Sequence, residues 1–245
     1  EETRACTGCG SCKPEVQAIV ELACQGLEAP ALLEAPAVEI APSSVPDGGQ
    51  VVVTLNKIER IKSEKDGLDI VEELPRLAQD GWQAIDEGDR ERLKWAGIFF
   101  RRQTPGRFMM RVRISNGLTR ADQIRTLAEI SSEFGVGYAD ITTRQQIQLR
   151  GYEIGHAPEI WRRLEAVGLG SLQTGMDNVR GVIGCAMAGL TRHELFDASP
   201  VVQEYTDRFL RNKAFTNLPR KFNVAITGCT EHCTHADTQD LGLTP

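Results

Sequence analysis

The sequence lacks long hydrophobic runs and any excess of positive charge. No segment approaches the roughly 18 consecutive apolar residues that a membrane-spanning helix needs. No basic segment followed by an apolar one opens the chain, as a secretory signal would. The net charge is −6, which argues against general nucleic-acid binding. We therefore expect a cytoplasmic globular protein that binds neither membranes nor nucleic acid.

Acidic residues are missing from the polar faces of predicted strands. In the segment 108–114, apolar residues alternate with Arg111 and Arg113, and in the segment 221–227 they alternate with Lys221 and Asn223. A face that only meets solvent normally mixes charges of both signs. A bound polyanion therefore explains these faces better than solubility does, although an exposed basic sheet face remains the alternative.

The segment 140–151 extends this pattern. Read as one strand, it places Ile141, Ile147 and Leu149 on a face toward the core. The opposite face contains no acidic residue between positions 142 and 150, and its members are Thr142, Arg144, Gln146, Gln148 and Arg150. We interpret this stretch as the centre of an anion-binding site.

Cysteines cluster near the N-terminus. Cys6, Cys9 and Cys12 follow one another at two-residue intervals before a predicted helix. In a cytosolic chain such clustering favours metal binding or redox chemistry over a disulfide, and reduced structural cysteines are the alternative. The spacing alone does not decide the metal: a bacterial four-iron ferredoxin would need cysteine at Val16, and a zinc ribbon would need a second pair near Cys24.

The remaining chain divides by composition and periodicity. Residues 1–26 form the Cys-rich helical module, and the Pro- and Ala-rich residues 27–50 form a semi-rigid linker. Residues 51–100 read as a helical extension, in which a cluster of basic residues is expected to be a solvated helix face. Its members are Lys57, Arg60, Lys62 and Lys65.

Two further segments predict an α+β fold. Strand and helix patterns alternate over residues 101–170, as in a ferredoxin-like half-domain. Residues 171–245 are rich in glycine near Asn178 and Arg180, which lets the backbone approach a flat ligand.

Four motifs in order give a resemblance to a known family. They are Pro-Gly-Arg-Phe-Met-Met-Arg, Asp-Ile-Thr-Thr-Arg-Gln-Gln-Ile-Gln-Leu-Arg-Gly, Thr-Gly-Met-Asp-Asn-Val-Arg and Asn-Leu-Pro-Arg-Lys-Phe-Asn. From about residue 57 to 245 the chain resembles the N-terminal half of ferredoxin-type nitrite reductases, in the sirohaem nitrite and sulfite reductase superfamily. The resemblance implies a ferredoxin-like half-domain followed by a truncated sirohaem and [4Fe-4S] domain, and a reaction that reduces nitrite to ammonia with six electrons.

The resemblance also assigns roles to individual residues. It implies substrate binding and proton supply by Arg111, Arg180, Lys221 and Asn223. Lys221 is preferred for proton delivery because lysine, unlike arginine, can lose a proton. Contacts to the carboxylates of sirohaem are implied for Arg144, Gln148 and Arg150, and we add Arg113 and Asn178 as cofactor-binding residues.

Asn223 bears on the substrate. In this resemblance sulfite reductases tend to have lysine at that place and nitrite reductases asparagine, which favours nitrite here. A sulfite reductase of the same superfamily and a non-catalytic anion- or partner-binding module are the alternatives.

A second resemblance covers the N-terminus. Residues 6–15 resemble the closing part of a bacterioferritin-associated-ferredoxin-like [2Fe-2S] domain, which implies that Cys9 and Cys12 bind a cluster. Either ferredoxin or a fused NAD(P)H–flavin module would then supply electrons. The iron-binding roles of Cys6, Cys185, Cys229 and Cys233 stay open. Because the family's axial thiolate and most ligands of the [4Fe-4S] cluster belong to its second half, we expect an incomplete chain that does not turn over alone.

Overall fold

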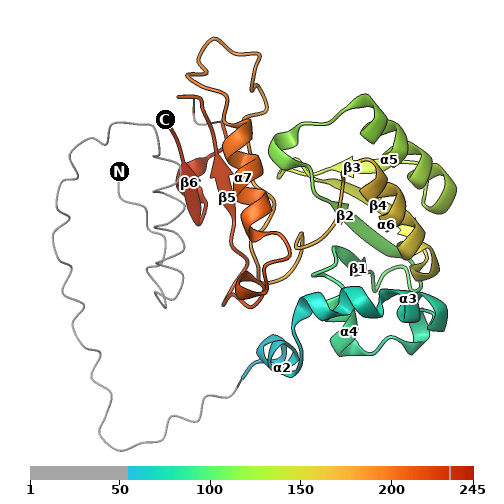
Figure 1. The fold of residues 1–245 in the computed structure, drawn as a ribbon. Helices are drawn as coiled ribbons and strands as arrows, with labels where there is room; N and C mark the ends of the chain where they lie inside the picture. Colours follow the sequence, from blue (N-terminus) through green and yellow to red (C-terminus); the bar gives the residue numbers. More distant parts are fainter. Residues whose placement is uncertain (1–54, 232) are drawn as a thin grey trace, which may run out of the picture.

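The computed structural model describes residues 55–231 and 233–245 (Figure 1). The predicted [2Fe-2S] module, with Cys9 and Cys12, and the predicted linker lie outside the described residues. Among the helices that the structure describes, none is long and apolar enough to cross a membrane.

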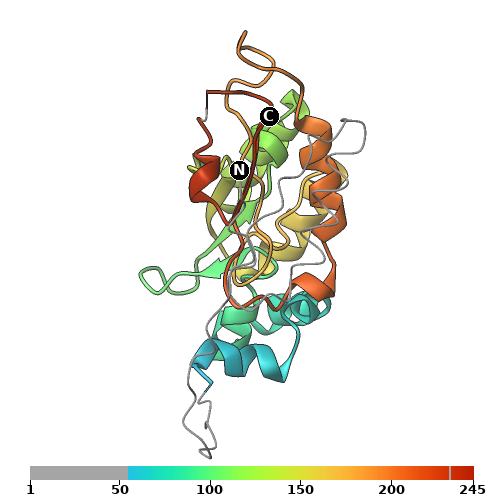
Figure 2. The ribbon, with the colours of Figure 1, turned by 90° about the vertical axis from the view of Figure 1, so that its left-hand side faces the viewer.

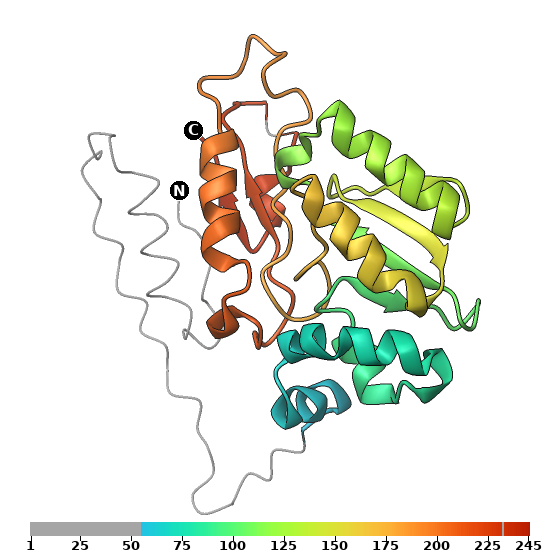
Figure 3. The same ribbon diagram turned by 45° about the vertical axis from the view of Figure 1, so that its right-hand side comes forward.

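A four-stranded antiparallel sheet forms one half of the structure. Its strands are β1 (Ile98–Phe100), β2 (Phe108–Val112), β3 (Ala139–Ile141) and β4 (Ile147–Tyr152), in the spatial order β1-β2-β4-β3. Helices α5 (Ala121–Phe134) and α6 (Ala157–Ala166) lie across one face of it (Figure 3). The sequence β2-α5-β3-β4-α6 is that of a ferredoxin-like unit, with β1 beside β2 at the sheet edge. This confirms the predicted fold of the half-domain.

The alternation of β2 and β4 separates a core face from a polar face. Phe108, Met110 and Leu149 are buried in one apolar cluster with residues of α3, α5 and α6. On the other face, Arg111 of β2 stands opposite Gln148 of β4. The helices therefore leave the charged face of the sheet free to form a site.

The segment 140–151 is a hairpin rather than the single strand that its alternation predicts. Thr142 Oγ1 accepts hydrogen bonds from the backbone N–H groups of Arg144 (3.3 Å) and Gln146 (3.1 Å), and Gln145 adopts a φ of 57°. These bonds fold residues 142–146 into a turn between β3 and β4. Ile141, predicted to face the core, lies on the edge strand β3 and is 82% exposed.

Within residues 55–97, three helices precede the sheet and lie at its lower end in Figure 1. They are α2 (Lys57–Glu64), α3 (Ile70–Asp80) and α4 (Glu87–Arg92). The expectation of a solvated basic face on α2 is wrong for Lys62, whose exposure is only 7%. Short 3-10 helices connect the elements throughout: η1 (Gly67–Asp69), η2 (Trp82–Ala84), η3 (Ser115–Gly117), η4 (Ile154–His156), η5 (Lys213–Phe215) and η6 (Ala236–Thr238).

A second apolar cluster holds the C-terminal part together. Helix α7 (Ser199–Phe209) packs against β5 (Val224–Ile226) and β6 (Leu241–Leu243), which pair in parallel. Isolated bridges also join Val179 to Phe222 and Ile183 to Ala225, so that residues 179–183 run beside β5. Figure 2, from the side of β6 and α7, shows the N-terminal helices below this unit.

Candidate anion-binding site

Three arginines from separate segments line one hollow of about 250 Å³. Arg111 comes from β2, Arg144 from the hairpin turn, and Arg180 from the glycine-rich segment that leads to β5. The other lining residues are Thr142, Thr143, Gln146, Gln148, Thr174 and Gly181. No aspartate or glutamate is among them. We call this the three-arginine hollow.

Arg111 is held between an aromatic ring and a backbone carbonyl. Its guanidinium carbon lies 4.7 Å from the centre of the Phe99 ring, and its Nη1 donates a hydrogen bond to the Thr174 carbonyl at 3.1 Å. Burial, and then the nearby charge of Arg150, lower the pKa of Arg111. Its Nε is buried without a hydrogen-bond partner among the described residues.

Arg180 is fixed by its own turn. Its Nε donates to the Met176 carbonyl and its Nη1 to the Thr174 carbonyl, both at 2.9 Å. Burial and then the charges of Arg111 and Arg144 together lower the pKa of Arg180 to about 10, while the carboxylate of Asp177 acts in the opposite sense. The same Thr174 carbonyl therefore accepts hydrogen bonds from two of the arginines.

Arg144 closes the hollow from the turn. Its Nη2 donates to the Gly181 carbonyl at 2.6 Å, and its Nη1 donates to Gln239 Oε1 at 3.3 Å. Burial lowers the pKa of Arg144, while the carboxylate of Asp240 acts in the opposite sense. Arg144 is thus partly balanced, whereas the pKa of Arg111 is shifted by burial and by another arginine only.

The charge pattern suits a ligand with several negative oxygens. Guanidinium groups that are half-buried and repel one another are costly unless an anion offsets them. Each guanidinium also offers a planar fork of donors that matches a carboxylate. The residues present therefore fit the carboxylates of a tetrapyrrole such as sirohaem, and they equally fit a small oxyanion.

Gln148 and Arg150 form the edge of the site. Gln148 lines the three-arginine hollow, and its Oε1 accepts a hydrogen bond from Arg150 Nη2 at 2.8 Å. Arg150 also forms an ion pair with Asp140 and is not among the lining residues. The charge of Arg150 is therefore balanced by Asp140. The sequence pattern did not predict this ion pair, because the predicted polar face covers only positions 142 to 150.

Lys221 and Asn223 lie next to Arg180 but outside the hollow. The backbone N–H of Arg180 donates to the carbonyl of Phe222, which stands between them, at 2.9 Å. Lys221 is exposed and Asn223 half-buried, and the N–H of Asn223 donates to Asp240 Oδ2 at 2.7 Å. Their roles in substrate binding and proton supply stay predictions.

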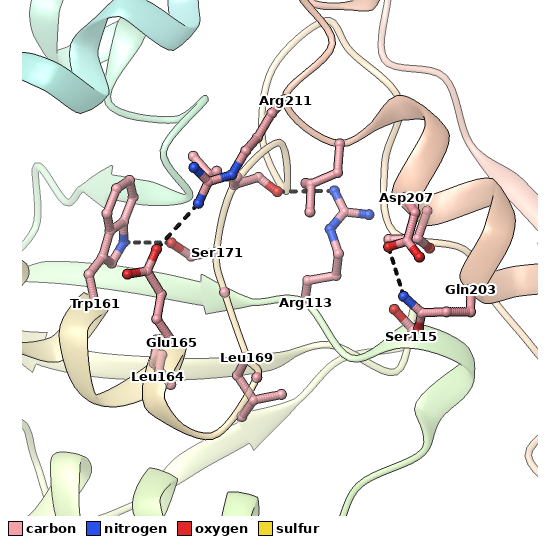
Figure 4. Close-up of a pocket in the computed structure, with 15 residues that line it drawn as sticks. Arg113, Ser115, Trp161, Leu164, Glu165, Leu169, Ser171, Gln203, Asp207 and Arg211 are labelled. Atoms are coloured by element: carbon pink, nitrogen blue, oxygen red, sulfur yellow. Dashed lines mark hydrogen bonds and ion pairs between the residues drawn. The ribbon is translucent and has the colours of Figure 1, made fainter.

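Asn178 and Arg113 lie behind the hollow. Asn178 is 0% exposed, and its side-chain amide donates to the Gly175 carbonyl. Arg113 Nη2 donates to the carbonyls of Leu172 (3.0 Å) and Gln173 (3.1 Å) and lines a different hollow (Figure 4). Both side chains hold the backbone that leads to Arg180, and their predicted cofactor contacts stay predictions.

Two lining residues, Thr143 and Thr174, were not singled out from the sequence, whereas Thr142 and Gln146 belong to the predicted polar face. Gln146 is 3% exposed, its Nε2 donates to the Arg144 carbonyl at 2.8 Å, and its Oε1 is buried without a partner among the described residues. A Cβ at Gly181 would lie 2.8 Å from this amide, so glycine is needed for the close approach. The polar run Thr-Thr-Arg-Gln-Gln could have indicated Thr143 as well, whereas nothing in the sequence marked Thr174.

Cys185, Cys229 and Cys233 lie in the part of the chain that the structure describes. No group of three or more metal-ligating side chains is found there. Cys229 is buried and Cys233 exposed, and burial raises the pKa of Cys185. The neighbouring thiols of Cys229 and Cys233 also raise the pKa of Cys185, so the three thiols lie near one another, and their iron-binding roles stay open.

Comparison with known proteins gives the family. Residues 100–167 match the model described as the nitrite/sulfite reductase ferredoxin-like half domain, and residues 175–245 match the nitrite and sulphite reductase 4Fe-4S domain. The chain belongs to the nitrite and sulfite reductase family. The two matches follow the same order as the sheet unit and the C-terminal unit, and they meet where the three-arginine hollow is formed.

Individual relatives of this reductase family share both segments. The ferredoxin–nitrite reductase of Leptolyngbya laminosa is 48% identical over 198 residues, which is 78% of this chain and 39% of that protein. The ferredoxin–nitrite reductase of Synechococcus elongatus is 49% identical over 197 residues, covering 78% and 38% of the two chains. The solved structure of the Mycobacterium tuberculosis NirA protein superimposes with a TM-score of 0.68 at 34% identity, over 73% of this chain and 36% of the other. The chain thus spans less than half the length of these relatives.

Proposed function

We propose that this chain forms the first half of a nitrite reductase in which the three-arginine hollow binds the carboxylates of sirohaem and the anionic substrate. The observation that carries the proposal is the convergence of Arg111, Arg144 and Arg180 on one hollow without a lining acid. The names of the relatives in Leptolyngbya and Synechococcus support nitrite as the substrate.

The arginines would act by position and charge. Arg144, from the hairpin turn, and Gln148, the cross-strand neighbour of Arg111, suit macrocycle carboxylates, while Arg111 and Arg180 share the Thr174 carbonyl and suit the substrate. Fixed positive charge stabilises negative oxygen without reorganisation, an effect of about 3 to 4 kcal/mol for a well-placed donor. Sirohaem, with a [4Fe-4S] cluster, would supply the electrons and the iron that binds the substrate.

Proton supply is proposed for Lys221. It is exposed, follows Leu218 and Arg220 on the segment that enters β5, and lies close in sequence to Asn223. An ammonium can donate a proton and regain it from solvent. Asn223 in place of a second lysine suits the singly charged nitrite better than sulfite.

Ferredoxin is the proposed electron donor, because the curated relatives are named ferredoxin–nitrite reductases. The predicted [2Fe-2S] module and a fused NAD(P)H–flavin module stay predictions that rest on Cys9 and Cys12. The cytoplasmic location also stays a prediction, since the spinach relative is named chloroplastic.

Turnover by the protein expressed from its complete natural reading frame tests the proposed function. With reduced methyl viologen as electron donor, we expect nitrite to be consumed and ammonia to form, with a higher kcat/KM for nitrite than for sulfite. A higher kcat/KM for sulfite would instead identify a sulfite reductase. A protein that binds no sirohaem and reduces neither anion would identify a non-catalytic module and refute the proposal.

A further inference from the structure

A buried lysine connects the N-terminal helix α2 to the anion-binding site. Lys62 Nζ donates a hydrogen bond to the Leu218 carbonyl at 2.9 Å and lies 2.6 Å from Glu59 Oε1 and 3.4 Å from Asp177 Oδ2. A buried ammonium is costly unless it is paired and hydrogen-bonded, and these three contacts satisfy its donors. The contacts to Asp177 and Leu218 cross more than a hundred positions of sequence.

Both distant partners of Lys62 belong to segments that carry site residues. Asp177 lies in the turn between Thr174 and Arg180, and Leu218 comes shortly before Lys221. The two segments are also joined directly, because the N–H of Leu218 donates to the Asp177 carbonyl at 3.0 Å. One ammonium therefore ties α2 to both segments at the point where they meet.

Asp177 and Asp240 are acidic groups near the three-arginine hollow, and the charge of Asp177 already raises the pKa of Arg180 against the effect of burial. A direct ion pair between Asp177 and Arg180 would neutralise more of the hollow's charge. Asp177 lies within the turn of Arg180, whose guanidinium is held by the carbonyls of Thr174 and Met176. Among the ion pairs of the described residues, Asp177 pairs with Lys62 and not with Arg180. Arg180 is the basic residue nearest to Asp177 in sequence. If position 62 lacked an ammonium, the Asp177 carboxylate would be free to pair with the guanidinium of Arg180.

We propose that Lys62 is a positioning residue that sets the anion affinity of the three-arginine hollow by holding the Asp177 carboxylate away from Arg180. The inference rests on the proposed function of that hollow. It assigns to α2, which lies outside both matched family segments, control over the charge available to the ligand.

A double-mutant cycle separates this role from simple structural support. The protein expressed from its complete natural reading frame is compared as wild type, Lys62→Met, Asp177→Asn and the double variant. Each is titrated with sirohaem, followed by visible absorbance, and each is melted without ligand. We expect Lys62→Met to weaken sirohaem binding by about tenfold, the lower end of what a charge-assisted hydrogen bond contributes. Asp177→Asn should bind at least as tightly as wild type, since it removes the competing carboxylate.

The decisive variant is Lys62→Met with Asp177→Asn. If Lys62 acts by restraining Asp177, the double variant regains affinity to within about threefold of wild type, although its melting temperature stays low. A merely structural lysine would leave the double variant as weak as Lys62→Met, and this result overturns the inference. Affinity unchanged by Lys62→Met also overturns it.

Two controls keep the outcomes distinct. Lys62→Arg retains the positive charge and should bind within about threefold of wild type. If Lys62→Met does not fold, Asp177→Asn decides alone, because a loss of affinity in that variant contradicts the inference. A wild-type chain that binds no sirohaem contradicts the proposed function itself, whereas normal wild-type binding with unaffected variants contradicts only the role of Lys62.

Discussion

Two hollows of similar volume differ in their charge balance. The three-arginine hollow measures about 250 Å³, and the hollow of Figure 4, between α6 and α7, about 230 Å³. In the second, Arg211 Nη2 lies 3.3 Å from Glu165 Oε1, and Gln203 Nε2 donates to Asp207 Oδ1 at 2.8 Å. The charged residues that line this second hollow are two cations and two anions, Arg113, Arg211, Glu165 and Asp207, and we call it the mixed-charge hollow. The charged residues that line the three-arginine hollow are all cations. The two hollows therefore differ in the balance of their charges and not in volume.

Removing two of the three cations should have the largest effect. We expect Arg111→Met combined with Arg180→Met to weaken sirohaem binding by about 100-fold or more, because each charge-assisted contact contributes about 1.5 to 3 kcal/mol. Visible-absorbance titration measures the loss. The matched control is Arg211→Met in the mixed-charge hollow, which should bind sirohaem within about twofold of wild type. Equal losses in both hollows would show that the comparison is wrong.

A smaller effect is expected at Arg144. Gln239 accepts one of its hydrogen bonds, and Asp240 offsets part of its charge, so less of its charge is available to a ligand. Arg144→Met should weaken sirohaem binding by about tenfold, which is less than the loss from Arg111 and Arg180 together. The same titration measures it, and a loss larger than that of the double variant would reverse the ranking.

Small polycarboxylates should stabilise the ligand-free chain through the three-arginine hollow. Binding to the folded state alone raises stability, and about 1 kcal/mol corresponds to a rise of about 2 to 4 °C in melting temperature for a domain of this size. We expect citrate to give such a rise relative to chloride at equal ionic strength, and Arg211→Met to retain it. An equal rise in the variant lacking Arg111 and Arg180 would mean that citrate acts elsewhere.

The smallest effect concerns stability alone. Trp161 Nε1 donates to Ser171 Oγ at 2.7 Å in the wall of the mixed-charge hollow. Trp161→Phe removes this bond and should lower the free energy of unfolding by about 1 to 2 kcal/mol, as measured by urea denaturation. Sirohaem binding should not change. A loss of binding would show that this hollow also contributes to the site.

The sequence predicted the members of the site better than their contacts. Alternation in β2 put Arg111 on the polar face, and the motif around Arg180 located the third cation. The turn at Thr142 was missed because the Thr142 hydroxyl stabilises it, and neither glycine nor proline marks it in the sequence. The alternation of apolar residues also continues across the turn, from Ile141 to Ile147 and Leu149. The pairing of Arg150 with Asp140 followed from that turn, since only a hairpin brings these two residues together.

The burial of Lys62 was missed for a different reason. Local periodicity in α2 cannot show that a segment more than a hundred residues later supplies the partners Asp177 and Leu218. Long-range hydrogen bonds of this kind become visible only when the segments are folded against one another. The helices α5 and α6 and the strands β2 and β4 depend on local patterns and were predicted, whereas the separate edge strand β3 was not.

Binding of metal-free sirohydrochlorin and of its methyl ester to the wild-type chain tests the central claim most directly. The ester has the same ring but no negative carboxylates, so the arginines have nothing to balance them. Fluorescence titration should show binding of the free acid that weakens as salt rises, and at least about 100-fold weaker binding of the ester. Equal affinity for both, without salt dependence, would contradict the claim that unbalanced arginine charge makes the site.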